Sequence, residues 1–118
     1  MQSYLALILG ATIGSSIRYF FYLINLSAYG IPLSTLIVNI IGSSLAGFFY
    51  GKFQSSAYVF MYLGLFGSLT TLSAFNLELF QLISNKDFLR SIIYFFFNII
   101  ITLICFYIFH LISLKIAS

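Results

Sequence analysis

The sequence predicts an all-α integral membrane protein with four transmembrane helices. Of its 118 residues, 62% are hydrophobic and only 6% are charged, whereas soluble domains typically carry about 25% charged residues. One helical crossing takes about 20 apolar residues, so four crossings use most of this chain. We therefore expect a single four-helix transmembrane domain over residues 1–118, with only short turns between the helices.

Four apolar segments define the expected helices, which cover about residues 4–24, 33–51, 57–83 and 91–114. The first segment lacks the basic leader and the cleavage site of a signal peptide. The second begins after Pro32, the only proline in the chain, and proline suits the start of a helix. Polar turns separate the segments.

The basic residues do not favour one orientation in the membrane. With four crossings, both termini and the second loop lie on one side, which carries Lys52 and Lys115, while the other side carries Lys86 and Arg90. An excess of Lys and Arg normally marks the cytoplasmic side. This balance fits insertion in both orientations and hence an antiparallel dimer, but five basic residues also give noisy statistics. The net charge of +3 is too scattered for a nucleic-acid partner.

Small and polar residues form one stripe on the second expected helix. They recur at spacings of three and four and comprise Thr35, Asn39, Gly42, Ser43, Ala46 and Gly47. Close packing of helices explains the glycines, because small residues let two backbones approach. An amide inside the membrane needs hydrogen-bond partners, so both a packing role and a functional role stay open for Asn39.

The middle of the third segment, residues 67–74, is poor in helix-favouring residues and rich in hydroxyl groups. A tight helix crossing is one interpretation. The other is a break within the membrane, which frees carbonyl and amide groups that protein, water or an ion must satisfy. Freed carbonyls suit a small hard cation such as sodium, whereas hydroxyls and amides suit a small anion.

Three further features concern the remaining polar residues. Tyr94, Asn98 and Thr102 follow at four-residue intervals, so one face of the fourth helix carries a ladder of hydrogen-bond donors. Arg18 is the one cation well inside an apolar run; it either bonds carbonyls at a helix end or raises the anion concentration in a vestibule. One His, one Cys and two acids assemble no catalytic set, so we do not expect an enzyme.

Taken in order, these motifs resemble the CrcB/Fluc family of small bacterial fluoride channels. Residues 10–19 look like the family's glycine-rich opening, which ends in Arg and an aromatic residue. Residues 32–42 are similar to its motif P-x-G-T-L-x-V-N-x-x-G. Residues 67–75, followed by Glu78, are similar to its motif G-x-x-T-T-F-S-T-F. The resemblance covers essentially the whole chain.

The resemblance implies a passive, fluoride-selective channel that is surrounded by the lipid of a bacterial plasma membrane and exports cytoplasmic fluoride. It implies an antiparallel, dual-topology homodimer with two pathways at the subunit interface. A central structural sodium ion is expected at the break in the third helix, bound by the backbone carbonyls of Gly67 and Thr70. The expected pathway residues are Asn39, Leu72, Ser73, Phe75, Tyr94, Asn98 and Thr102.

The chain departs from the family pattern at Ser34, Ala74 and Leu72. Leu72 stands where the family has the first of two phenylalanines whose ring edges face fluoride, and Phe75 matches the second. Leucine has no positively polarised ring edge, so a non-conducting or half-functional subunit, paired with a paralogous chain, is an alternative. A small multidrug antiporter is less well supported, because its chemistry needs a membrane carboxylate, usually in the first helix, and Arg18 is the only charge there.

Overall fold

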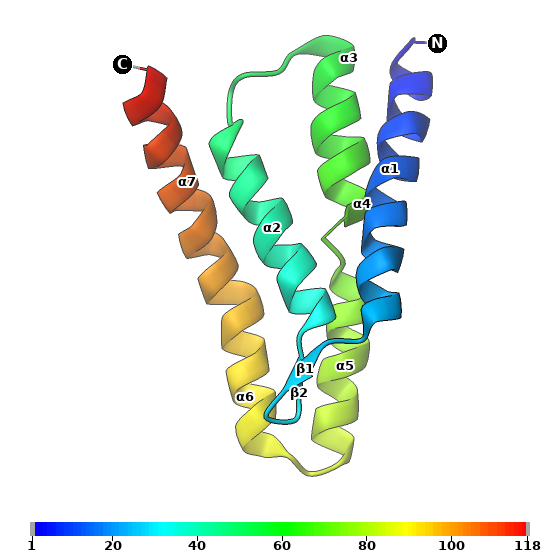
Figure 1. The fold of residues 1–118 in the computed structure, drawn as a ribbon, viewed down its shortest axis with the longest axis vertical. Helices are drawn as coiled ribbons and strands as arrows, with labels where there is room; N and C mark the ends of the chain where they lie inside the picture. The colour runs from blue at the N-terminus through cyan, green and yellow to red at the C-terminus, as the bar shows by residue number, and fades with distance from the viewer. Residues whose placement is uncertain (1, 118) are drawn as a thin grey trace.

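The computed structural model describes residues 2–117 as a bundle of long helices, with both chain ends at the same end of the bundle (Figure 1). A two-stranded hairpin lies towards the opposite end, above the turn between α5 and α6 (Figure 1), and two segments, η1 and η2, are π-helical. In chain order the elements are α1 (Gln2–Ile24), β1 (Ser27–Ala28), β2 (Ile31–Pro32), α2 (Ser34–Phe48), α3 (Ser55–Tyr58), η1 (Val59–Phe66), α4 (Gly67–Leu69), α5 (Leu72–Ser84), α6 (Phe88–Phe96), η2 (Phe97–Ile101) and α7 (Thr102–Ala117).

Three helical segments in the described chain are long and apolar enough to cross a bilayer: Gln2–Ile24, Ser55–Ser84 and Phe88–Ala117. The fourth apolar helix, α2, has 15 residues and a length of about 22 Å. It ends at Phe48, earlier than the sequence predicted, and Gly51 then takes a φ of 78° in the turn that follows. Large apolar side chains are exposed along the bundle, as expected where lipid is the solvent. The chain is therefore an all-α, multi-pass membrane protein.

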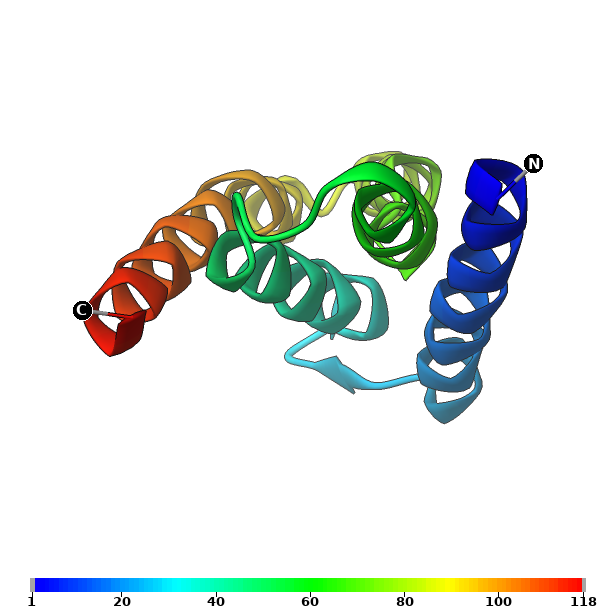
Figure 2. The same ribbon diagram turned by 90° about the horizontal axis from the view of Figure 1, so that it is seen from above.

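The helices pack in two close pairs, α1 against η1 and α4, and α2 against α7. Viewed from the end, α2 lies between α7 and the α3–α4 stretch, and α1 lies outside that stretch (Figure 2). Each pair meets at glycines. A Cβ atom on Gly10 would overlap the Phe60 carbonyl, and one on Gly47 would overlap the Phe106 carbonyl. Small residues thus allow backbone-to-backbone contact, as the stripe on the second helix suggested.

The hairpin is tied to the start of α6. Its strands pair antiparallel, with Ser27 opposite Pro32, and Tyr29 and Gly30 at its tip both have positive φ. The Arg90 guanidinium donates from Nε to the Tyr29 carbonyl and from a terminal nitrogen to Asp87, 2.7 Å away. Arg90 therefore holds the hairpin tip against the helical end.

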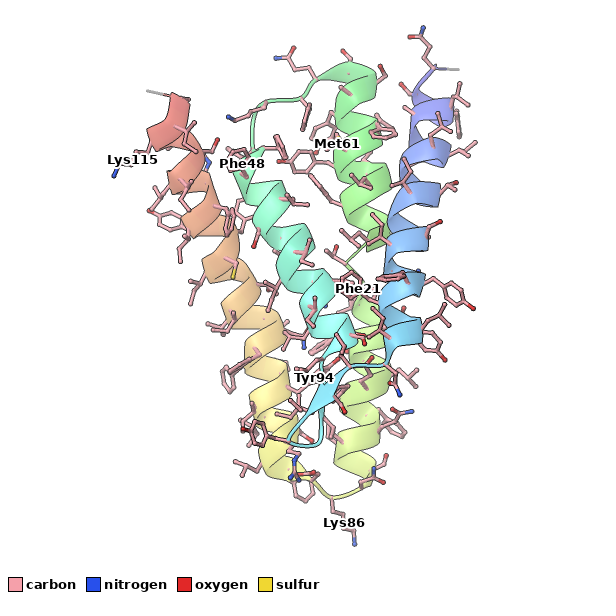
Figure 3. All side chains as sticks on the ribbon, viewed as in Figure 1. Phe21, Phe48, Met61, Lys86, Tyr94 and Lys115 are labelled. Atoms are coloured by element: carbon pink, nitrogen blue, oxygen red, sulfur yellow. The ribbon has the colours of Figure 1, made fainter. Side chains whose placement is uncertain are left out.

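Replacing Arg90 with alanine is expected to loosen the hairpin without unfolding the bundle. Of the two hydrogen bonds that Arg90 donates, the one to the hairpin comes from a charged donor, and its loss should accelerate amide exchange across residues 25–33 about tenfold. Hydrogen–deuterium exchange with mass spectrometry measures this. Lys86→Ala removes a charge from the same end, where the side chain points away from the bundle (Figure 3), and should leave the hairpin unchanged. Equal exchange in the two variants would contradict the role of Arg90.

Candidate functional site

The helical segment Ser55–Ser84 is interrupted about halfway along the bundle, between α4 and α5 (Figure 1). α4 ends at Leu69, and Thr70 and Thr71 take extended backbone angles, with φ of −121° and −117° and ψ of 105° and 123°. α5 then begins at Leu72, and the Thr71 hydroxyl caps it by accepting from the Ala74 amide at 3.3 Å. Threonine hydroxyls compete in this way with helical hydrogen bonds and favour helix starts.

The interruption releases main-chain carbonyls. The Thr71 amide donates to Asn39 Oδ1 at 3.0 Å, so the Gly67 carbonyl loses the partner that a continuous helix would supply. The Thr70 carbonyl loses its partner in the same way, because the Ala74 amide donates to Thr71 Oγ1. The Ser68 carbonyl accepts from Arg18 Nε at 3.0 Å. Two side chains from other helices, Asn39 and Arg18, therefore hold the interruption in place.

Asn39 also links the interruption to the Phe88–Ala117 helix. Its Nδ2 donates to Asn98 Oδ1 at 2.9 Å, and Asn98 Nδ2 donates to the Tyr94 carbonyl at 3.1 Å. Thr102 Oγ1 donates to the Asn98 carbonyl at 2.6 Å. Asn39, Asn98 and Thr102 are all nearly buried. Such buried polar groups are costly in a membrane unless they are paired, so this network indicates a specific role for these positions.

A recess of about 190 Å³ opens beside the interruption. It brings together five of the residues that the sequence analysis assigned to a pathway, from α2, α5, η2 and α7. Its lining is Asn39, Ser43, Thr70, Thr71, Leu72, Phe75, Asn98, Ile99 and Thr102. None of these side chains is charged, so the recess presents neutral amides and hydroxyls between apolar walls.

The aromatic and aliphatic positions of the recess differ in exposure. Phe75 is buried, and its ring lies 5.5 Å from the ring of Tyr94 between centroids. Leu72 is 69% exposed, so it lies at the open side of the recess. Ser73 is exposed and pairs with Thr71 Oγ1 at 3.1 Å. Neither Ser73 nor Tyr94 lines the recess, although both were assigned to the pathway from the sequence.

A second cavity, of about 350 Å³, lies at the hairpin side of the interruption. Arg18 and Glu78 both line it, and they bring opposite charges to one space. The Thr35 hydroxyl donates to Glu78 Oε1 at 2.5 Å, and the Tyr94 hydroxyl donates to Oε2 of the same carboxylate. Arg18 thus bonds a main-chain carbonyl and also lines this cavity, while an effect of its charge on the local anion concentration stays a prediction.

Thr35 and Glu78 meet at this second cavity, although neither was assigned to the pathway from the sequence. The signal was present, because Glu78 is the only acid in the third segment and an ionisable residue within a membrane helix usually serves a function. The sequence did not indicate which hydroxyl groups would donate hydrogen bonds to Glu78. Tyr94 lies 16 residues away and Thr35 lies 43 residues away, and only the folded chain brings the three together.

Replacing Glu78 with leucine is expected to lower the stability of the fold by about 2 kcal/mol, because two hydroxyl groups lose their acceptor. The melting temperature of the purified protein in detergent measures the effect. Glu78→Gln keeps an acceptor oxygen and should cost clearly less. A leucine variant as stable as the wild type would show that these hydrogen bonds contribute nothing to the fold.

The chain is similar to known proteins over most of its length. Residues 5–109 match the family model described as CrcB-like protein, Camphor Resistance (CrcB). The chain is 34% identical over 121 residues to the fluoride-specific ion channel FluC of Methanococcus aeolicus, which covers 98% of both chains. It is 42% identical over 89 residues to the fluoride-specific ion channel FluC 1 of Streptococcus pneumoniae, which covers 75% of this chain and 79% of the relative. A FluC 1 of Ligilactobacillus salivarius is 36% identical over 82% of this chain and 83% of its own.

Proposed function

Since the chain belongs to the CrcB-like family, we propose that it is a passive, fluoride-selective ion channel. The observation that carries the proposal is the uncharged recess in which Asn39, Asn98, Thr102 and Phe75 meet beside the interrupted helix. Relatives over nearly the whole length of the chain are named fluoride-specific channels. The channel lets cytoplasmic fluoride leave through a bacterial plasma membrane, down its electrochemical gradient.

The chemistry of the recess suits fluoride. Fluoride is small, strongly hydrated and a strong hydrogen-bond acceptor. A pathway for it replaces water with donors, but a strong fixed charge would prevent the ion from leaving. Amide and hydroxyl groups are donors of moderate strength, and the positively polarised edge of the Phe75 ring adds a weak one. The apolar walls at Leu72 and Ile99 disfavour ions that these donors do not compensate.

A second copy of the chain completes the pathway. The recess is open at Leu72, and in a lone chain the partly exposed Thr70 and Thr71 beside it would face lipid. Lys52 and Lys115 at one end balance Lys86 and Arg90 at the other, which is compatible with insertion in both orientations. We infer an antiparallel homodimer, in which each of two pathways lies between the chains.

The released carbonyls of Gly67 and Thr70 fit a structural sodium ion at the dimer axis. Hard cations prefer oxygen ligands, and both carbonyls have lost their helical partners. Gly67 is exposed, so its backbone is accessible to a second chain. Two copies would supply four such oxygens, and the bound cation would join the two interruptions.

A second candidate function follows from Leu72. Its exposed side chain stands where a phenylalanine would present its ring edge to fluoride. In this alternative the chain is one half of a heterodimer, and a paralogous chain with both phenylalanines supplies a complete pathway. A multidrug antiporter lacks support, because the only charged residue in α1 is Arg18.

The test is efflux from liposomes that contain the purified chain alone. The liposomes are loaded with potassium fluoride, and a fluoride electrode follows release after valinomycin is added. We expect rapid fluoride release and no chloride release from chloride-loaded liposomes. Well-folded protein that releases no fluoride would contradict a homodimeric channel, and the same assay with a paralogous chain co-purified would then test the heterodimer.

Replacing Leu72 with phenylalanine is expected to raise fluoride efflux by up to about fivefold, since a ring edge contributes about 1 kcal/mol to a polar contact. The initial rate in the liposome assay measures the change. Leu77→Phe adds a ring to an exposed position of the same helix that lines the second cavity and not the recess, and it should leave the rate unchanged. A slower Leu72→Phe channel would show that leucine is the better residue in this pathway.

A further inference from the structure

An unbroken chain of hydrogen bonds runs from the interruption between α4 and α5 to the Phe88–Ala117 helix. It starts at the Thr71 amide, which donates to Asn39 Oδ1 at 3.0 Å. It continues through Asn39 Nδ2 to Asn98 Oδ1 at 2.9 Å and ends at the Tyr94 carbonyl, which accepts from Asn98 Nδ2 at 3.1 Å. Both asparagine side chains are at least nine-tenths buried, so water offers no substitute for these partners.

The two ends of this chain determine the orientation of both amides. A backbone N–H can only donate, so the group of Asn39 that faces Thr71 must be its oxygen. A backbone carbonyl can only accept, so the group of Asn98 that faces Tyr94 must be its nitrogen. The bond between the two side chains then runs from Asn39 to Asn98 with no alternative. Turning either amide over would set donor against donor or acceptor against acceptor at two contacts.

This polarity has two consequences at the recess that Asn39 and Asn98 line. Both amide oxygens are engaged within the protein, so neither is left to repel an anion, while each nitrogen keeps one further N–H group. In addition, the Thr71 amide is held on Asn39, away from the Gly67 carbonyl. Asn98 thereby influences both the amide N–H groups that face the recess and, through Asn39, the shape of the interruption.

We infer that Asn98 is a positioning residue, which acts through Asn39 to hold the Thr71 amide out of the helix and to keep both amides turned with their donors free. Asn98 fulfils this role through its acceptor oxygen, which orients Asn39, and through its bond to Tyr94, which orients Asn98 itself. The placement of the interruption follows from the hydrogen bonds alone, whereas its relevance to conduction rests on the proposed function.

Hydrogen–deuterium exchange of the full chain in lipid nanodiscs tests the inference, read at the Thr71 amide. Asn98→Leu has nearly the same shape as the wild type but no acceptor, and Thr71 should exchange about tenfold faster. Asn98→Asp keeps an oxygen for Asn39 and, in its neutral form, a donor for Tyr94, so exchange should stay within about twofold of the wild type. Rescue by the aspartate variant distinguishes positioning from a loss of packing.

Ser91→Ala is the matched control, because Ser91 is buried on the same Phe88–Ala117 helix as Asn98, and its hydroxyl donates to the Asp87 carbonyl one turn earlier. Thr71 should exchange at the wild-type rate in this variant. Unchanged exchange in Asn98→Leu, or exchange in Asn98→Asp as fast as in Asn98→Leu, would overturn the inference. If the leucine variant does not fold, Asn98→Ser carries the same expectation, because its hydroxyl is too short to reach Asn39.

The same preparations separate this inference from the proposed function. Fluoride efflux is measured on the wild type in parallel with the exchange. Wild-type protein that releases no fluoride would refute a homodimeric channel, yet faster exchange at Thr71 in Asn98→Leu would still support the positioning role. Fluoride release by the wild type together with unchanged exchange in Asn98→Leu would refute the positioning role alone.

Discussion

Replacing Asn39 with leucine is expected to lower fluoride efflux by about a hundredfold. Leucine offers no oxygen to the Thr71 amide and no N–H to Asn98, so two buried hydrogen bonds of 3.0 and 2.9 Å are lost. At about 1–1.5 kcal/mol each, this loss corresponds to roughly a hundredfold change in rate if both contacts persist in the conducting state. The initial rate of fluoride release from liposomes measures the effect.

A matched variant on the same helix controls for damage to α2. Ser44 is buried, but it does not line the recess, so Ser44→Ala should conduct at close to the wild-type rate. Gel filtration of each variant before reconstitution establishes that the protein is folded and of the expected size. Wild-type efflux from a folded Asn39→Leu variant would remove Asn39 from the pathway and from the support of the interruption.

Replacing Gly47 with alanine is expected to prevent stable folding. A Cβ atom at this position would overlap the main chain of Phe106, which belongs to α7 and cannot move aside as the end of a side chain can. The α2–α7 contact would have to open along its length, at a cost of about 3 kcal/mol or more. That is a large fraction of the stability of a small protein, so we expect little monodisperse protein after extraction into detergent.

Gly51 provides the control, because it lies just beyond the end of the same helix and a Cβ atom there meets nothing within 4 Å. Its φ of 78° is unfavourable for other residues, so Gly51→Ala should cost only about 1 kcal/mol. Yield and melting temperature should therefore fall far more for Gly47→Ala than for Gly51→Ala. Equal losses would mean that the close approach of α2 and α7 is not required.

Part of the candidate site was predictable because its signals are local in the sequence. The hydroxyl-rich stretch at residues 67–74 indicated either a tight crossing or a break, and the structure has extended residues at Thr70 and Thr71. Asn39 was selected because a membrane amide requires partners. Its actual partners, the Thr71 amide and Asn98, lie 32 and 59 residues away, and no spacing rule predicts contacts at such separations.

For Tyr94, periodicity predicted the helix face but not the partner of its hydroxyl group. Its four-residue spacing from Asn98 and Thr102 placed the three on one helix face, and the sequence analysis grouped them as one ladder. In the structure the Tyr94 hydroxyl donates to Glu78, which lines the second cavity, while Asn98 and Thr102 line the recess. A long side chain carries its polar group well away from its own Cα, so a shared face does not ensure a shared cavity.

The sequence by itself determined the membrane environment, the number of apolar segments and the residues able to form a polar site, because composition and helical periodicity depend on the chain alone. The tertiary structure decided which carbonyls are released, which amide oxygens are engaged and which hydroxyls share Glu78. These features are hydrogen bonds between distant segments. Their direction depends on how α2, α5 and α6 are placed against one another, and the close approach of the helix backbones at Gly10 and Gly47 makes that placement possible.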